Sequence, residues 1–317
     1  MARDGAVLLL GNGLSIAVNE NLRLDRLTAT FLERHRDEQE LIQRLVEGVN
    51  LGAVEPAVDF EGIVAGLESA EAVITGFIGL AQHVDLPELR EAAEVLEANG
   101  VPAKVRQLYY AYCADVLEAI GDLTRGEIPD AVLDFGEWVK AQHARHRRLA
   151  IFTLNYDVLM ERMLIGPDLL DMKRQTTDFF GYPRSTFALA EGVDPIEGFA
   201  FHAQQPPPRR NVHLHHLHGC LTHLRAPDGT IYKFSGGAIR KARLYRKLAD
   251  GARSDFVPSV ILGSKKAERA LEWPFSHAFA ALEEEVAAAR TVCIAGTRSA
   301  TRRSTSGCGR DWPASSG

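Results

Sequence analysis

The amino-terminal segment of the chain reads Val7-Leu8-Leu9-Leu10-Gly11-Asn12-Gly13-Leu14-Ser15-Ile16-Ala17. Its four leading apolar residues predict a buried strand, and the glycine turn after them runs into residues that favour a helix. Backbone amides in such a turn can approach a pyrophosphate, whose charge the helix N-terminus favours. The alternative is a tight turn with Asn12 or Gly13 at positive φ and no ligand. The segment indicates the first unit of a nucleotide-binding α/β fold.

Composition places the chain among ordinary globular proteins. It has 317 residues, of which 46% are hydrophobic and 25% charged, enough for one large domain or two small ones. A net charge of -6 gives no global positive field, so we expect no direct nucleic-acid binding and no anionic membrane surface as a partner. The four cysteines lack the spacing of a structural zinc site, which predicts reduced thiols and a cytoplasmic location. We also expect no membrane helix, which needs about 20 apolar residues.

The rest of the chain is first helical and then alternates strands with helices. From about Leu24 to Gln142, apolar residues recur at three- and four-residue spacing, which is typical of helices. Strands are predicted at 149–153, 212–214, 230–234, 260–262 and 290–295, with a helix over 271–289. Apolar strands separated by helices predict an α/β fold: a Rossmann-like parallel sheet with helices on both faces, plus a large helical insertion.

A second polar motif, Thr153-Leu154-Asn155-Tyr156-Asp157, follows the strand predicted at 149–153. Open α/β sheets bind their ligands at this end of the strands. Asn155 can orient a water or bond a ribose hydroxyl, and Asp157 can hold a carboxamide. The alternative is that both residues only cap the next helix, which is expected to start near Val158.

A third motif carries four histidines in the stretch Asn211-Val212-His213-Leu214-His215-His216-Leu217-His218-Gly219. On an extended strand His213 and His215 would face one side and His216 and His218 the other, so we expect no metal site. His218 precedes a glycine, which would leave room for a ligand, and an imidazole titrating near neutrality suits a general base. A hydrogen-bonded core histidine is the alternative.

These three motifs, in this order, resemble the sirtuin family. The glycine turn with Ser15 is similar to the sirtuin phosphate loop, Thr153 to Asp157 to its asparagine-aspartate motif, and His218-Gly219 to its catalytic pair. The closer resemblance is to the divergent prokaryotic sirtuin-like (Sir2-like) domains of anti-phage defence, in which tyrosine and aspartate follow the asparagine. Those relatives hydrolyse NAD rather than deacylate proteins. The resemblance covers residues 6–20, 148–163, 211–221 and 258–296, which is less than half of the chain.

The resemblance implies that NAD is the substrate and that no metal takes part. Asn155 would position the water or the ribose, His218 would act as the base, and Asp157 would hold the carboxamide. The implied phosphate and adenosine contacts come from the glycine turn and from the loop after the last strand: Gly11, Asn12, Gly13, Leu14, Ser15 and Gly296. A protein activator or homo-oligomerisation would trigger the enzyme.

Two other functions stay open from the sequence. One is a non-catalytic module that senses NAD or ADP-ribose. The other is an NAD-dependent protein deacylase, which is disfavoured because sirtuins carry a zinc module with paired CxxC motifs and this chain has none.

The predicted domain organisation has three parts. Residues 1–23 and 143–296 form the sirtuin-like domain, residues 24–142 the helical insertion, and residues 297–317 a disordered tail without apolar periodicity. Our hypothesis is that the tail is frameshifted, because codons for residues 297–308 can be chosen that, with one base added after Gly296, encode the family's motif. Such a shift would remove a helix that covers the sheet and part of the cofactor site, and the activity would be lost with that part of the site.

Two aromatic segments have structural predictions. We expect Asp178-Phe179-Phe180-Gly181-Tyr182 to be a loop packed by its own aromatics, and Trp273 and Phe275 to be core or interface residues. Glu61, which follows Asp59-Phe60 at the start of a predicted helix, is interpreted as a first-turn charge rather than a catalytic group.

Overall fold

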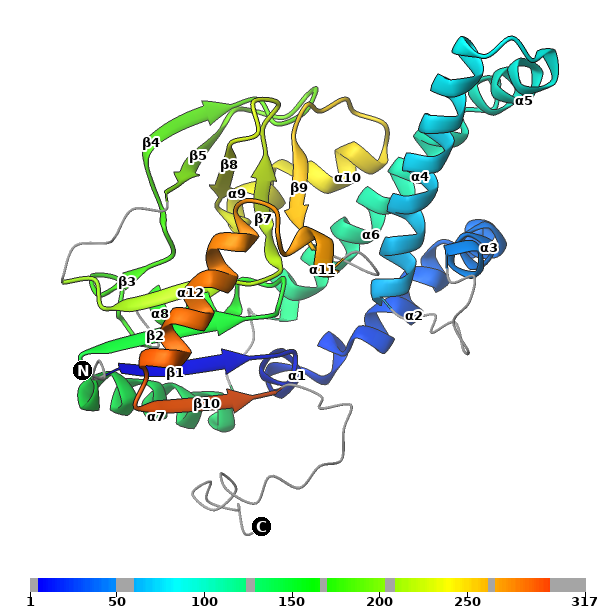
Figure 1. Cartoon of the computed structure of the whole chain (residues 1–317). Coiled ribbons are helices and arrows are strands. Elements are labelled where there is room, and N and C mark those ends of the chain that lie inside the picture. The colour runs from blue at the N-terminus through cyan, green and yellow to red at the C-terminus, as the bar shows by residue number, and fades with distance from the viewer. Residues whose placement is uncertain are drawn as a thin grey trace.

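The computed structural model describes residues 5–49, 60–123, 129–165, 170–202, 209–261 and 266–296. A five-stranded parallel sheet forms the centre of the fold, in the order β10-β1-β2-β6-β3 (Figure 1). Its strands are β1 (Gly5–Leu10), β2 (Arg148–Thr153), β3 (Thr176–Thr177), β6 (Val212–His216) and β10 (Thr291–Ala295). All of its pairings are parallel, which confirms the predicted Rossmann-like sheet.

A second sheet, which the sequence analysis did not predict, is antiparallel and has the order β4-β5-β8-β7-β9. It comprises β4 (Phe180–Phe187), β5 (Ile196–Phe201), β7 (Gly219–Arg225), β8 (Ile231–Phe234) and β9 (Val257–Val260). Two of the predicted strands, near 231 and 260, therefore belong here and not to the parallel sheet. Short loops such as 226–230 permit antiparallel neighbours, whereas a parallel pair needs a crossover of a dozen or more residues.

Helices occupy the region between β1 and β2, as predicted. They are α1 (Gly13–Val18), α2 (Leu24–Arg34), α3 (Gln39–Val49), α4 (Phe60–His83), α5 (Pro87–Ala98), α6 (Val101–Leu123) and α7 (Asp130–Arg145), with short 3-10 turns at Glu20–Leu22 and Arg36–Glu38. In Figure 1, α4 and α5 extend away from the two sheets. Asp59 lies outside the described residues, as does the side chain of Glu61.

The helix α7, which the predicted boundary at residue 142 places in the insertion, packs on the parallel sheet. Val132, Phe135 and Val139 of α7 share a core with Leu8 and Ile151 of the parallel sheet. Because α7 buries its apolar face on this sheet, it belongs to the sheet domain, and the insertion ends before it.

Helices cover both faces of the parallel sheet. The helices after β2 are α8 (Leu159–Ile165), α9 (Gly236–Ala242), α10 (Leu244–Ala249), α11 (Lys266–Arg269) and α12 (Phe275–Ala288). While α7 covers one face, Ala278 of α12 packs with Val7 and Phe152 on the other. At the edge of the sheet, Cys293 and Ala295 of β10 pack toward α7. The side chains of Val292 and Ile294, which alternate with them, are 38% and 63% exposed. The tail predicted to be disordered or frameshifted, 297–317, lies outside the described residues.

One described helix reaches the length and apolarity of a membrane span, contrary to the expectation from the sequence. It is the Gly62–His83 part of α4, which is 22 residues long and contains an 18-residue stretch with a mean hydropathy of 1.6. Ile63, Val64 and Leu67 are buried in a core that includes Leu108 of α6. Packing inside the helical insertion therefore accounts for part of its apolar composition.

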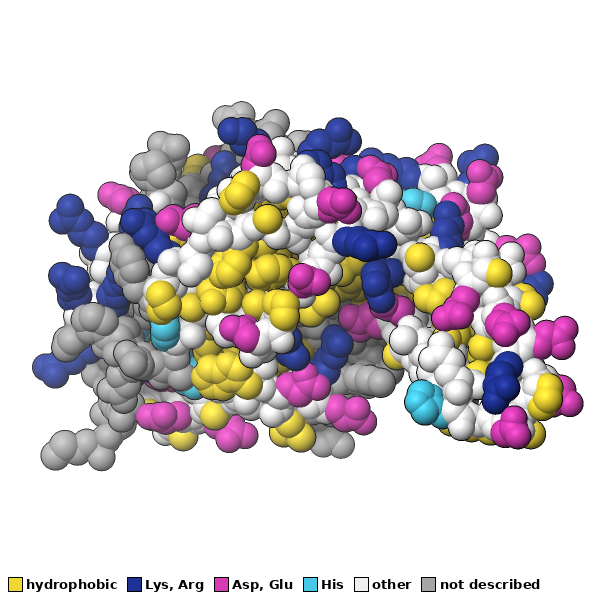
Figure 2. Space-filling view, turned by 90° about the horizontal axis from the view of Figure 1, so that it is seen from above, with side chains coloured by type: hydrophobic (Ala, Val, Ile, Leu, Met, Phe, Trp, Pro, Cys, Tyr) yellow, Lys and Arg dark blue, Asp and Glu magenta, His cyan; other side chains and the backbone are white. Residues whose placement is uncertain are grey.

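Charges of both signs share the surface of the molecule. Figure 2 shows acidic and basic side chains interspersed over one face, around a central group of hydrophobic side chains. Among the described residues on this face, neither sign of charge forms a continuous surface. This face therefore offers no extended basic area of the kind that attracts a polyanion.

Candidate active site

The three sequence motifs meet at the carboxyl edge of the parallel sheet. In the strand register Leu10 pairs with Thr153, and Thr153 pairs with His216. The segments that follow these strands, 11–15, 154–157 and 217–218, consequently share one edge. This is where ligands bind in open α/β sheets.

A hydrogen-bonded triad joins the first two motifs. Asn155 Nδ2 donates to Ser15 Oγ at 3.0 Å, and Ser15 Oγ donates to Asp157 Oδ2 at 2.5 Å. Ser15 and Asn155 are 1% and 7% exposed. Burial raises the pKa of Asp157 above its ordinary value. The triad fixes the Asn155 amide against α1.

Asp157 also caps the following helix. Its Oδ1 accepts from Leu159 N at 2.9 Å, and α8 begins at Leu159, one residue after the predicted start. The capping alternative thus holds for one carboxylate oxygen of Asp157. Asn155 instead contacts Ser15 through its side chain, while its backbone N donates to Thr153 Oγ1 at 3.0 Å.

The glycine turn packs directly against the end of β10. Gly11 N donates to Ala295 O at 2.9 Å, Gly13 N to Gly296 O at 3.0 Å, and Leu14 N to Gly11 O at 3.3 Å. A Cβ on Gly13 would lie 2.5 Å from Gly296 Cα. Neither Asn12 nor Gly13 has the positive φ expected for a ligand-free turn; Gly296 has it instead, at 70°. Each of these three amides already donates to a backbone carbonyl, so a phosphate at Gly13 would have to replace the Gly296 carbonyl.

His218 lies beside the second motif, in the turn that leads from β6 to β7. Its ring is partly exposed and stacks on Tyr156 with ring centroids 6.2 Å apart, and Phe279 of α12 lies 6.4 Å away. Its backbone O accepts from Ile261 N at 2.8 Å. His218 therefore neighbours the residue between Asn155 and Asp157.

Gly219 has a structural reason to be glycine. Its φ is 76°, and a Cβ there would lie 2.1 Å from Ser259 O and 3.1 Å from the Phe275 ring. The space expected to admit a ligand beside His218 is filled by β9 and α12.

His216 is the residue of the site that the sequence analysis missed. Its Nδ1 donates to Asn155 O at 3.3 Å, and its Nε2 donates to Glu161 Oε1 at 2.9 Å. Both ring nitrogens thus face acceptors. Burial alone would lower the pKa of His216, but Glu161 raises it above its ordinary value. We interpret His216 as an imidazolium that holds the Asn155 backbone.

Glu161 and His216 belong to a buried charge network completed by Lys233 and Asp178. Lys233 Nζ donates to Glu161 Oε1 at 3.0 Å and to Asp178 Oδ2 at 2.6 Å. Burial opposes ionisation of Glu161, yet His216 and Lys233 hold its pKa well below the ordinary range. Two cations and two anions cancel, so the network joins α8, β6, β8 and the start of β4 without net charge. The sequence signal for this network is an acidic residue among apolar ones, in the stretch Leu159-Met160-Glu161-Arg162-Met163-Leu164.

The histidine stretch behaves only partly as predicted. His213 and His215 share a face, with ring centroids 6.4 Å apart. His216 and His218 have different neighbours: His216 contacts Glu161 and His223, whereas His218 contacts Tyr156 and Phe279. The turn after β6 separates them, because His218 is no longer on the strand.

One group of potential metal ligands includes His216. Donor atoms of Glu161, His216 and Cys220 lie within 4.8 Å of one another. Burial raises the pKa of the Cys220 thiol to about 12, and Lys233 already supplies a cation to Glu161. We assign no metal to this group.

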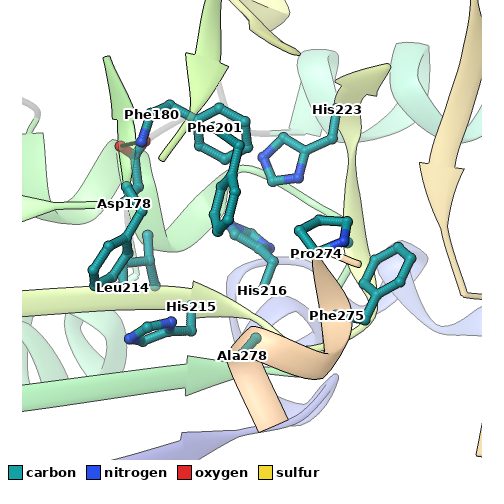
Figure 3. A pocket seen from close by; sticks show the side chains of 12 residues that line it. Asp178, Phe180, Phe201, Leu214, His215, His216, His223, Pro274, Phe275 and Ala278 are labelled. Atoms are coloured by element: carbon teal, nitrogen blue, oxygen red, sulfur yellow. Dashed lines mark hydrogen bonds between the residues drawn. The ribbon is translucent and has the colours of Figure 1, made fainter. Parts of the chain in front are cut away.

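A pocket is lined by His215 and His216 of β6 and by Phe275 and Ala278 of α12 (Figure 3). Asp178, Phe179 and Phe180 line it, so the loop predicted to pack on its own aromatics instead forms a pocket wall. Phe179, for example, contacts His215 at 4.5 Å between ring centroids. Phe275 is buried and lines the pocket, as expected for a core aromatic, whereas Trp273 is 49% exposed and contacts Phe201.

Comparison with known proteins identifies no relative. No family model matches the chain, and no curated protein matches it significantly. The function therefore has to be argued from the site and from the motifs that form it.

Proposed function

We propose that this chain is a sirtuin-like NAD glycohydrolase, which cleaves NAD to nicotinamide and ADP-ribose. The observation that carries the proposal is the Ser15–Asn155–Asp157 triad, in which the two motifs that resemble sirtuin motifs contact each other. The triad lies at the carboxyl edge of a parallel sheet, with His218 next to it on Tyr156. A role as a cytoplasmic anti-phage effector, switched on by a protein activator or by oligomerisation, rests on the resemblance of Asn155-Tyr156-Asp157 alone.

Cleavage of NAD depends on the positioning of the water and the ribose more than on a strong acid. The bond from ribose C1′ to the nicotinamide nitrogen breaks, its electron pair neutralises the cationic ring, and the ribose passes through an oxocarbenium-like state. The oxygen of a water then bonds to C1′, and a proton of that water passes to His218.

Each residue has a defined task in this scheme. Asn155, whose Nδ2 is held by Ser15, uses Oδ1 to accept from the water or a ribose hydroxyl. Asp157 accepts from the carboxamide of nicotinamide. The glycine turn receives the phosphates once Gly13 N exchanges the Gly296 carbonyl for a phosphate oxygen. A Cβ at Gly13 would collide with Gly296, so the packing of the turn already requires glycine at this position.

A sensor that binds NAD or ADP-ribose without turnover is the second candidate. It would need the same opening of the glycine turn, because the amides of Gly11 and Gly13 already have acceptors in β10 and after it. An NAD-dependent protein deacylase is third, since the paired CxxC motifs are missing.

One experiment separates the three. The purified chain is incubated with NAD, with and without an acylated peptide, while free nicotinamide and NAD binding are measured. Nicotinamide release without peptide supports the hydrolase. Binding without release supports the sensor, and release only with peptide supports the deacylase. The absence of both binding and release contradicts all three.

Matched variants test the residue assignments. Asn155→Ala and His218→Ala should each abolish NAD cleavage. Asn99→Ala and His83→Ala, at exposed ends of α5 and α4, should leave it unchanged. Parental turnover in a folded Asn155→Ala or His218→Ala variant refutes that assignment.

A further inference from the structure

The pocket lined by His215 and His216 has mainly apolar walls. It opens to solvent and lies between the two sheets and α12. Aromatic side chains dominate its lining: Phe179, Phe180, Phe201, His215, His223 and Phe275. Figure 3 shows the rings of Phe180, Phe201, His215, His223 and Phe275 arranged around a common space. Aromatic rings pack best against another flat ring, edge-on or offset.

The pocket carries no net charge. Burial lowers the pKa of His215 to about 3 and that of His223 well below its ordinary value, so both are neutral at physiological pH. The charges of His216 and Asp178 are balanced within the buried charge network. A charged ligand would lose its hydration here without gaining an unpaired partner.

One polar atom in this wall has no partner. His223 is 6% exposed, and among the described residues no hydrogen-bonding group reaches its Nε2. In Figure 3 its ring lies between Phe201 and Pro274 and points into the pocket. A buried nitrogen left unsatisfied destabilises the fold, and native proteins seldom contain one without a reason.

We propose that this pocket is a binding site for a small, uncharged, planar aromatic ligand whose single polar group bonds His223 Nε2. The rings of Phe179, Phe201 and Phe275 enclose the flat face and edges of the ligand. No charged group is needed on either side. The site is distinct from the triad, because no residue of the triad lines it.

Benzamide is the probe, and its binding is measured without NAD so that the result does not depend on NAD hydrolysis. Ligand-observed NMR and calorimetry on the full chain should show saturable binding of benzamide. Benzoate, which has the same ring and a negative charge, should bind at least tenfold more weakly. Equal binding of benzoate and benzamide, or no saturable binding of benzamide, overturns the proposal.

Substitution of His223 gives a readout that a purely structural histidine would not give. His223→Leu removes the unsatisfied nitrogen, so it should raise the melting temperature by about 2–4 °C. The same change should weaken benzamide binding about fivefold, which corresponds to one neutral hydrogen bond. A lower melting temperature or unchanged benzamide affinity contradicts the role of His223.

Two more variants complete the test. Ala278→Leu, which adds bulk from α12 into the pocket, should abolish benzamide binding. His83→Leu, on the exposed end of α4, should change neither the affinity nor the melting temperature. Retained benzamide affinity in folded Ala278→Leu would place the ligand elsewhere and refute the site.

Discussion

The buried charge network makes a quantitative prediction for Glu161→Gln. Glu161 is 6% exposed, and its Oε1 accepts from His216 at 2.9 Å and from Lys233 at 3.0 Å. Breaking a buried ion pair by removing one charge costs about 3–5 kcal/mol, because the partner stays buried and uncompensated. The amide introduced by Glu161→Gln would keep an acceptor oxygen, and Lys233 keeps Asp178 at 2.6 Å, so we expect the lower end, about 3 kcal/mol.

Urea unfolding followed by circular dichroism measures this loss. With a slope of about 3 kcal/mol per molar urea, the midpoint should fall by about 1 M. Glu137→Gln is the matched control, because Glu137 pairs with Lys140 on the surface and is 71% exposed. That change should cost less than about 0.5 kcal/mol. If Glu161→Gln costs no more than the control, the network does not stabilise the fold.

The effect of Glu161→Gln should also depend on pH. The depressed pKa of Glu161 means that its contribution is present above 4.5, the ordinary value, and is lost as pH falls through the folded pKa. The raised pKa of His216 means that its contribution is present below 6.5 and is lost as pH rises through the folded pKa. The difference between the parent and Glu161→Gln should therefore be largest between pH 4.5 and 6.5 and shrink in alkaline solution. A difference that keeps growing above pH 6.5 contradicts the assignment of His216 as the imidazolium partner.

Three further predictions concern stability. Gly219→Ala should destabilise the chain by at least about 2 kcal/mol, because its φ is 76° and the new Cβ meets Ser259 O; unfolding that matches the parent would contradict this. Gly13→Ala should likewise destabilise the chain, because the new Cβ would collide with Gly296. Gly79→Ala, in a helix where nothing lies near the new Cβ, should instead stabilise it by about 0.5–1 kcal/mol. Thermal melts of both variants test the contrast. Leu8→Ala should cost about 2–5 kcal/mol in the core, while Ile294→Thr, at a side chain 63% exposed, should cost less than about 1 kcal/mol; similar losses in urea would mean that the β10 face is covered.

Local patterns predicted the parts of the fold that depend on neighbouring residues. The apolar run before Gly11 specified β1, and three- and four-residue spacing specified the helical block. The antiparallel sheet could not be predicted in the same way, because the pairing of β8 with β5 and β7 is a tertiary choice that strand propensity does not encode. The helix α7 was assigned to the insertion for a similar reason, since its sequence does not reveal which surface it covers.

The candidate site also contains residues that the local sequence predicts and residues that it does not. Ser15, Asn155 and Asp157 could be found because each lies within five residues of the end of a recognisable strand. His216 could not, since its role depends on Glu161, 55 residues away in the chain, and on a backbone carbonyl. The glycine at 219 was interpreted as room for a ligand, but the left-handed backbone and Ser259 account for it. A residue type alone does not tell whether a close approach comes from a ligand or from the fold.

A crystal structure of the Asn155→Ala variant with NAD tests the central proposal most directly, because the substrate should bind but not be cleaved. Our account predicts that the C1′ atom of the nicotinamide ribose lies between residue 155 and the imidazole of His218. The phosphates should lie at Gly11 to Ser15, with the Gly296 carbonyl displaced from Gly13 N. NAD bound away from this edge of the parallel sheet, or with its nicotinamide ribose remote from His218, would contradict it.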